Sequence, residues 1–222
     1  PRAAAEYCKK DGDYIELGTP PSERSKNQGK RNDLHQLVSA IGEGETDRKR
    51  LRTQFPEVCA KYPNFVTNVI LDHLPKPKVA IHPLRTWQSS LYKRLCLPPS
   101  DREILFIVDK KGNSGKSWFV SYYATVQDNS ISILPGKKAD MVYAFISLIR
   151  ENTKVVFLDA PRSKQGDFIQ YDFLEELKNG RIFNTKYESR MVEFQPVHVV
   201  VMMNEYPDDQ KLSEDRYVID VL

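Results

Sequence analysis

The sequence contains few cysteines and no long apolar stretch, and each absence argues against a class of protein. Its three cysteines, Cys8, Cys59 and Cys96, are far apart and odd in number, which argues against a disulfide framework and against a cysteine metal site. We therefore expect reduced thiols in an intracellular protein. No apolar stretch approaches the ~20 residues of a membrane-spanning helix, and no signal peptide opens the chain, so we expect no membrane partner.

Charge and length set further limits on the class of protein. The 222 residues are 40% hydrophobic and 28% charged, which is typical of a globular protein with one large or two small domains. The net charge of +3 does not by itself indicate nucleic acid, although cations are grouped at residues 26–31 and 48–52. The chain starts at Pro1 without an initiator methionine, so we expect a fragment of something longer.

The first third of the chain changes character twice. Residues 1–17 favour a helix and then a short extended piece, whereas residues 18–32 are rich in Pro, Ser, Gly, Lys and Arg and predict an exposed linker. Residues 33–75 carry apolar residues at helical spacing and predict four short helices. Such a module is too thin to bury a large core, so we expect it to pack on a partner or to self-associate.

The remaining chain, residues 76–222, alternates between strand and helix patterns after a proline-rich connector and an amphipathic helix at 84–95. The pattern predicts strands at 104–108, 131–134, 155–158, 197–203 and 218–222, with helices at 116–124, 140–150 and 171–178. Near-continuous apolar strands alternating with helices predict an α/β fold with a mostly parallel sheet that is covered on both faces.

A phosphate-binding loop follows the first of these strands, in the sequence ILFIVDKKGNSGKS at 104–117. Lys116 would reach the outer phosphates of a nucleotide, and the Ser117 hydroxyl would hold Mg²⁺. Backbone N–H groups would wrap the phosphates, at Gly112, Asn113, Ser114, Gly115 and Lys116. The pattern G-x-x-x-x-G-K-[ST] has its first glycine where Lys110 stands, and the alternative is a solvated loop.

Two other apolar strands also end in polar residues. Asp159 closes the strand VVFLD and could hold Mg²⁺, and Asn204 closes VVVMMN and could bind a γ-phosphate and a lytic water. Either residue alone is equally typical of a turn. Together with the phosphate loop they predict a site at the carboxyl edge of one sheet. Ala160 stands where many ATPases have a second acid, which leaves the catalytic base open between candidates such as Glu175 and Glu176.

Nucleic-acid contacts are predicted from a β-hairpin between residues 180 and 194. Cations at Arg181, Lys186 and Arg190 could track a phosphate backbone, and the Tyr187 ring could stack on a base of single-stranded DNA. An ordinary surface hairpin is the alternative. Arg216 could neutralise charge on a transferred phosphoryl group from a neighbouring subunit, or else form a surface ion pair with Asp215 or Glu214.

Taken together, these segments resemble the replication-initiator (Rep) proteins of circular single-stranded DNA viruses. GNSGKS, VVFLDAPR and VVVMMN look like their Walker A, Walker B and motif C, and residues 84–222 resemble their superfamily 3 helicase domain. The resemblance implies an AAA+-like P-loop NTPase that uses ATP and Mg²⁺. It also implies a ring, expected to be hexameric, that translocates 3′–5′ on single-stranded DNA with Lys116, Asp159, Asn204 and Arg216 as catalytic residues.

The start of the chain carries the same resemblance. AEYCKKDGD at 5–13 looks like motif III of the family's HUH endonuclease, which implies that Tyr7 attacks DNA, assisted by Lys10 and a divalent metal. None of the four histidines precedes Tyr7 or forms a His-x-His pair, so we expect the metal ligands outside this chain and no nicking by it. The full-length protein is expected to nick and join viral origin DNA in the host nucleus.

The segment QGKRNDLHQLV at 28–38 resembles the family's link into a helical oligomerisation module, which would collar the ring. Two other functions compete with the helicase hypothesis. One is a DNA-binding scaffold that binds ATP without hydrolysing it, which the missing acid at Ala160 favours. The other is a P-loop kinase, which leaves the Asn204 strand, Arg216 and the helical module without a purpose.

Overall fold

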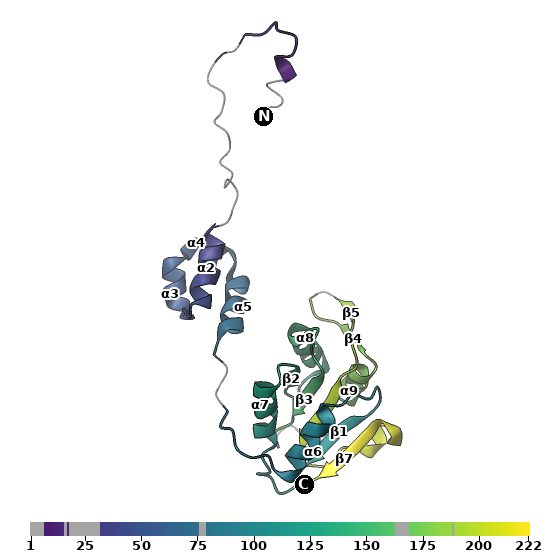
Figure 1. Ribbon diagram of the computed structural model, residues 1–222. Helices are drawn as coiled ribbons and strands as arrows, with labels where there is room; N and C mark the ends of the chain where they lie inside the picture. Colours follow the sequence, from purple (N-terminus) through teal and green to yellow (C-terminus); the bar gives the residue numbers. More distant parts are fainter. Residues whose placement is uncertain (1–6, 16, 18–31, 76–78, 163–168, 188) are drawn as a thin grey trace. The chain divides into compact units, whose positions relative to one another are not determined.

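The computed structural model describes residues 7–15, 17, 32–75, 79–162, 169–187 and 189–222. The chain divides into two compact units, residues 1–77 and 78–222, and each is described by itself (Figure 1). The expected linker lies outside the described residues except for Asn32, so the division into four segments stays a prediction. Among the described residues, no helix is both long enough and apolar enough to cross a membrane.

Four short helices build residues 32–73 of the first unit, as the sequence predicts. They are α2 (Asn32–Gly42), α3 (Arg48–Gln54), α4 (Pro56–Lys61) and α5 (Pro63–His73). Asp47 caps α3 by accepting a hydrogen bond from the Lys49 N–H at 2.8 Å. Pro56 and Pro63 begin the next two helices, where the missing N–H of proline costs nothing.

This helical unit encloses a small core of its own. The core consists of apolar side chains that are almost completely buried: Leu37, Ile41, Leu51, Val58, Val66 and Ile70. Residues 7–8 are helical and are followed by a turn. The extended piece expected at 14–17 forms no strand among its described residues, which are Tyr14, Ile15 and Leu17.

The second unit is built on a sheet that is entirely parallel in its described part. Its strands are β1 (Ile104–Val108), β2 (Ser130–Ile133), β3 (Val155–Asp159), β6 (His198–Met203) and β7 (Tyr217–Val221). Their order across the sheet is β2-β3-β6-β1-β7. All five predicted strands are therefore present, and the predicted parallel α/β sheet is confirmed.

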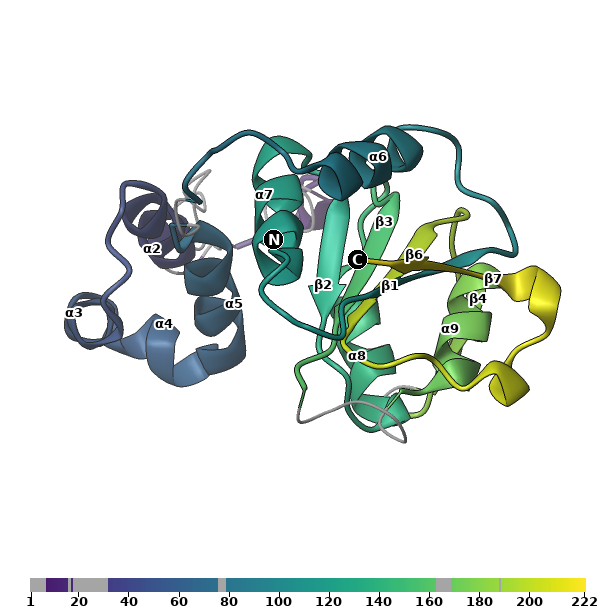
Figure 2. The same ribbon diagram turned by 90° about the horizontal axis from the view of Figure 1, so that it is seen from below.

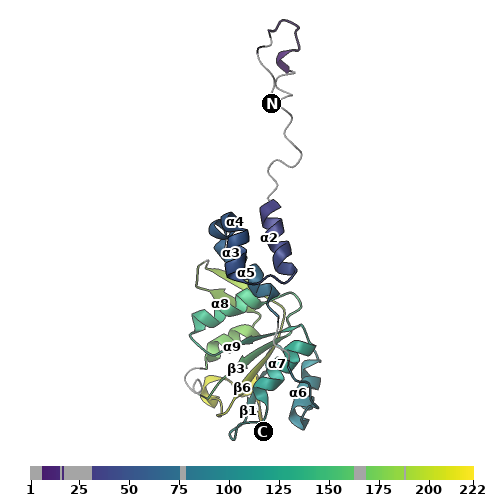
Figure 3. The ribbon, with the colours of Figure 1, turned by 90° about the vertical axis from the view of Figure 1, so that its left-hand side faces the viewer.

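Helices cover both faces of this sheet because almost every strand residue is apolar. Alternate strand residues such as Phe106, Leu158 and Val201 pack on α8 (Lys138–Leu148) and α9 (Tyr171–Lys178). The intervening residues, such as Ile107 and Phe157, pack on α6 (Thr86–Leu95) and α7 (Lys116–Val126). Figures 2 and 3 show the sheet between these two helix pairs.

The predicted hairpin is also present. It consists of β4 (Arg181–Asn184) and β5 (Arg190–Glu193), which pair antiparallel and lie beside α8 and α9 (Figure 1). Gly180 begins it in the left-handed region with φ +66°, and a Cβ there would lie 3.0 Å from the Phe194 carbonyl oxygen. Between β6 and β7 lie two short 3₁₀ turns, η2 (Asp209–Lys211) and η3 (Glu214–Arg216).

Strand register decides which side chains meet at the carboxyl edge of the sheet. β6 lies between β1 and β3, with Met203 opposite Val108 and Met202 opposite Asp159. The next residue of β6, Asn204, is therefore placed between the ends of its two neighbours. Open parallel sheets bind their ligands at this edge.

Candidate functional site

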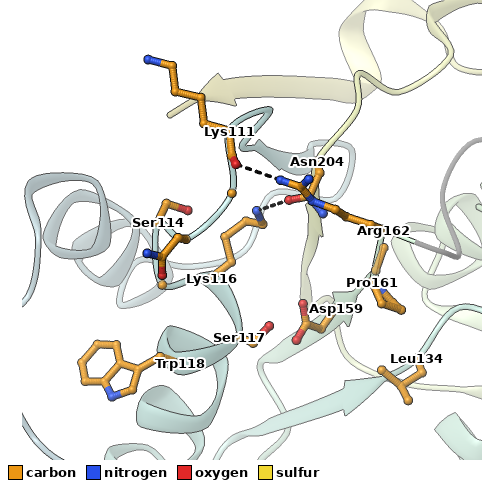
Figure 4. A pocket seen from close by; sticks show the side chains of 14 residues that line it. Lys111, Ser114, Lys116, Ser117, Trp118, Leu134, Asp159, Pro161, Arg162 and Asn204 are labelled. Carbon is orange, nitrogen blue, oxygen red and sulfur yellow. Dashed lines mark hydrogen bonds between the residues drawn. The ribbon is translucent and has the colours of Figure 1, made fainter.

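A cavity of about 770 Å³ opens at the carboxyl edge of the sheet (Figure 4). The loop after β1, the segment after β3 and the ends of β2 and β6 all contribute to it. Its fourteen lining residues are Lys111, Gly112, Asn113, Ser114, Gly115, Lys116, Ser117, Trp118, Leu134, Asp159, Ala160, Pro161, Arg162 and Asn204. The structure thus brings the predicted nucleotide-binding loop, Asp159 and Asn204 together in one site.

The loop reverses direction through three residues with left-handed backbone. Gly112, Asn113 and Gly115 have φ values of +83°, +63° and +82°, which glycine and asparagine tolerate best. Lys110, which replaces the first glycine of the pattern, does not have a positive φ. Its ammonium instead lies 4.3 Å from the centre of the Tyr206 ring. This position of the loop therefore does not require glycine.

The side chain of Asp109 holds the phosphate loop in place. Its carboxylate accepts hydrogen bonds from the N–H groups of Gly112 (2.7 Å) and Ser114 (3.1 Å) and from the Lys116 ammonium (3.2 Å). Burial alone would raise the pKa of Asp109, but these hydrogen bonds outweigh burial and hold the pKa well below its usual range. Sequence reasoning missed Asp109, although its position directly after an apolar strand was a signal for it.

Lys116 connects two strands that are far apart in the sequence. Its ammonium donates to Oδ1 of Asn204 at 2.7 Å as well as to Asp109, and the side chain is only 9% exposed. Figure 4 shows the ammonium pointing into the cavity toward Asn204. The lysine and the amide that were predicted to act on the same phosphate are therefore in direct contact.

Three side chains at the start of α6 hold the outer side of the loop. Arg85 donates to the carbonyl of Asn113 (3.1 Å), Trp87 to that of Ser114 (3.3 Å) and Gln88 to that of Gly115 (3.3 Å). Gln88 is completely buried although it is polar. The sequence predicted an amphipathic helix here but none of these contacts, because the residues that Trp87 and Gln88 contact are 27 positions away along the chain.

Ser117 and Asp159 face one another across the cavity, with their oxygens directed inward (Figure 4). A hydroxyl and a carboxylate are the hard oxygen ligands that Mg²⁺ prefers, so these residues fit the predicted metal. No group of three His, Cys, Asp or Glu side chains among the described residues could hold a metal alone. Phosphate and water oxygens would have to complete the coordination shell.

Asp159 is the only carboxylate among the described residues that line the cavity. Ala160 is buried, and its N–H donates to the carbonyl of Met202 at 2.9 Å. Glu175 and Glu176 pair with Arg216 and Lys138, and neither lines the cavity. The structure therefore offers no support for either glutamate as the base in this site.

Arg216 lies in η3, away from the cavity of its own chain. Its Nε is 3.6 Å from Oε1 of Glu175, a partner on α9. The alternative ion pair with Asp215 or Glu214 is not formed among the described residues, and Asp215 pairs with Arg102 at 2.5 Å. Arg216 therefore does not line the cavity of its own chain, and its expected role in a neighbouring subunit stays a prediction.

The four hairpin residues predicted to contact DNA lie on one projecting element, but one of them is already engaged. Lys186 forms an ion pair with Asp140 of α8. The hydrogen bond between the two groups lowers the pKa of Asp140 and raises that of Lys186. Tyr187 is 89% exposed, and its ring centre lies 5.3 Å from that of Tyr143, also on α8. Arg181 and Arg190 are exposed.

Tyr7 belongs to the first unit and is not placed relative to the cavity. Its side chain is exposed, and its carbonyl accepts a hydrogen bond from the Lys10 N–H in a helical turn. Both residues are thus on the surface of that unit, and their expected roles in DNA nicking stay predictions.

Comparisons with known proteins give the chain a family. No family model matches it. Para-Rep C7 of the Faba bean necrotic yellows C7 alphasatellite is 31% identical over 225 residues, which cover 99% of this chain and 74% of that protein. Para-Rep C10 of the Milk vetch dwarf C10 alphasatellite is 31% identical over 226 residues with the same coverage.

Among solved structures, the apo C-terminal region of NrS-1 covers 94% of this chain and 42% of its own, with 14% identity. Its TM-score of 0.37 is too low to carry an argument. The Para-Rep similarity extends over almost the whole chain and agrees with the resemblance found in the sequence. The chain therefore belongs to the Para-Rep family, the Rep proteins of alphasatellites with circular single-stranded DNA.

Proposed function

We propose that this chain is the ATP-dependent DNA helicase part of a rolling-circle replication initiator. One observation carries the proposal: Lys116 is held between Asp109 and Asn204 in the same cavity as Ser117 and Asp159. A buried cation, a loop of N–H donors and two hard oxygen ligands together fit a nucleoside triphosphate with its metal.

Five polar residues in and around the cavity would each have a part in hydrolysis. Lys116 neutralises charge on the outer phosphates, and Asn204 hydrogen-bonds phosphate or water without adding a repelling charge. Asp109 keeps the lysine and the loop in position before the substrate arrives. Ser117 and Asp159 would hold Mg²⁺, which neutralises charge on the β- and γ-phosphates when bound.

DNA would be bound by the hairpin. Its cations Arg181, Lys186 and Arg190 suit a phosphate backbone, and Tyr187 suits stacking on an unpaired base. Arg216 would act on the nucleotide of a neighbouring copy in a ring, which we propose to be hexameric. The helical unit at residues 33–75 would hold the ring together.

In the whole protein we propose a second activity in the host nucleus, the nicking and joining of viral origin DNA. Tyr7 would be the nucleophile there, with Lys10 beside it and a divalent metal held by residues outside this chain. A covalent adduct between Tyr7 and DNA formed by this chain alone would contradict that arrangement.

The proposal is tested by the rate of ATP hydrolysis with and without single-stranded DNA, measured together with unwinding of a partial duplex. We expect Mg²⁺-dependent hydrolysis that single-stranded DNA stimulates, and unwinding that requires ATP. Hydrolysis without any response to DNA would exclude a translocating motor.

A non-hydrolysing scaffold is the second candidate, and the absence of an acid at Ala160 favours it. In the part of the chain that the structure describes, Asp159 is the only carboxylate that lines the cavity, and no second acid lies there to orient water. The same experiment separates the two functions. A scaffold binds ATP and DNA but shows no turnover under either condition.

A further inference from the structure

Arg162, three residues after Asp159, is a cation of the cavity that sequence reasoning did not single out. Its guanidinium extends from the segment after β3 toward the phosphate loop (Figure 4), and it lines the same cavity as Lys116 and Asn204. Nη2 donates a hydrogen bond to the carbonyl oxygen of Lys111 at 2.8 Å. The side chain thus links the segment after β3 to the phosphate loop.

The loop is shaped to accept this guanidinium. A Cβ on Gly112 would collide with Nη2 of Arg162, so another residue there would require the guanidinium to shift. Gly112 also has a φ of +83°, which disfavours any other residue. Glycine at this position therefore allows the observed approach of Arg162 to the loop.

Among the described residues, no carboxylate forms a salt bridge with Arg162, whereas Lys116 is already paired with Asp109. One of its five N–H donors is used by Lys111, which leaves four for another acceptor. The fork of a guanidinium matches the oxygens of a phosphate group, to which it can donate two hydrogen bonds.

We propose that Arg162 binds the terminal phosphate of the nucleotide within its own subunit and so distinguishes a triphosphate from a diphosphate. This role rests on the proposed function and adds a residue in cis to the Arg216 expected from the neighbouring subunit.

The test is equilibrium binding of fluorescent ADP and of a fluorescent non-hydrolysable ATP analogue, so that the readout does not depend on turnover. Arg162→Gln is expected to weaken binding of the ATP analogue about tenfold, because a charged hydrogen bond is lost. Binding of ADP is expected to weaken less than twofold. Arg162→Lys keeps the charge but loses the fork, and an intermediate loss is expected. Arg150→Gln is the matched control, because Arg150 pairs with Asp128 outside the cavity.

Equal weakening of both nucleotides by Arg162→Gln, or no weakening, would overturn the role of Arg162 and leave the proposed function standing. Absence of any nucleotide binding by the unaltered chain would overturn both. Circular dichroism of each variant checks folding, and unchanged spectra are expected because Arg162 is exposed.

Discussion

The ammonium of Lys116 lies 2.7 Å from the amide oxygen of Asn204, 88 residues further along the chain. This contact joins the loop after β1 to the end of β6 across the carboxyl edge of the sheet. The two residues act as one polar unit, and Asp109 completes it on the other side of the lysine.

Replacement of Asn204 tests whether this unit works on the substrate. We expect Asn204→Ala to lower the rate of ATP hydrolysis about 100-fold, the usual cost of removing one oriented polar group from such a site. Binding of ADP should change little, since the amide is expected to face the terminal phosphate. Steady-state hydrolysis and ADP titration check this. An unchanged rate of hydrolysis would show that Asn204 has no part in the reaction.

Replacement of Asp109 tests the anchor of the loop. Asp109→Asn leaves the buried Lys116 without its carboxylate, so we expect a loss of about 3 kcal/mol in the free energy of unfolding at pH 7. Urea denaturation measures this loss.

The pH dependence of this effect follows from the sign of the pKa shift. Burial raises and hydrogen bonds lower the pKa of Asp109, and the net shift is downward. The stabilisation is therefore complete above the usual carboxyl pKa of about 4 and is lost as the pH falls below it. The difference in the free energy of unfolding between Asp109→Asn and the unaltered chain should therefore shrink well below pH 4. A difference that stayed the same there would contradict the lowered pKa of Asp109.

Lys178 gives a prediction at alkaline pH. Burial lowers its pKa to about 8 against the opposing effect of Asp101 and Glu103, and its ammonium donates to the carbonyls of Ser100 and Val197. Between pH 8 and the ordinary lysine value of 10.5, the unfolded chain holds a proton that the folded chain has released. The contribution of Lys178 to stability therefore rises with pH over this window.

We expect the free energy of unfolding to rise by about 1–2 kcal/mol between pH 7.5 and 9.5, relative to Lys178→Met, which lacks the titrating group. Urea denaturation of both proteins at the two pH values gives the difference. A constant difference would show that Lys178 has an ordinary pKa.

The ion pair between Lys186 and Asp140 predicts that α8 restrains the hairpin. A DNA phosphate must compete with Asp140 for the lysine, so Asp140→Asn should strengthen binding of single-stranded DNA about two- to fivefold at low salt. The salt dependence should become steeper, because one more cation is free to contact phosphate. Asp128→Asn removes a carboxylate from the pair with Arg150 instead and serves as control. Equal effects of the two variants would contradict a specific role for Asp140.

Much of the fold was predictable from the sequence because its strands are continuous apolar runs that end in polar residues. The strand Ile104–Val108 and the helix Tyr171–Lys178 have the predicted bounds. The meeting of Lys116, Asp159 and Asn204 followed from a general rule, that parallel strands share one carboxyl edge.

The rest depended on contacts that no local pattern contains. From the sequence alone, Asp109 is typical of a turn, and only the structure shows its three hydrogen bonds to the loop. Lys110 departs from the glycine of the motif, and only the structure shows its contact with the Tyr206 ring. Gln88 and Arg162 approach the loop from 27 and 51 residues away. Such distances in sequence are bridged only by the packing of whole elements.

Hydrolysis of ATP by Lys116→Ala, compared with Lys111→Ala, tests the central claim most directly. Both changes remove one lysine from the same loop, but Lys111 is exposed, whereas Lys116 is buried and donates to Asn204. We predict that Lys116→Ala lowers the rate of hydrolysis about 100-fold or more and leaves the circular dichroism spectrum unchanged. Lys111→Ala should keep the rate within about twofold of the unaltered chain. Hydrolysis by Lys116→Ala at the rate of the unaltered chain would contradict the account.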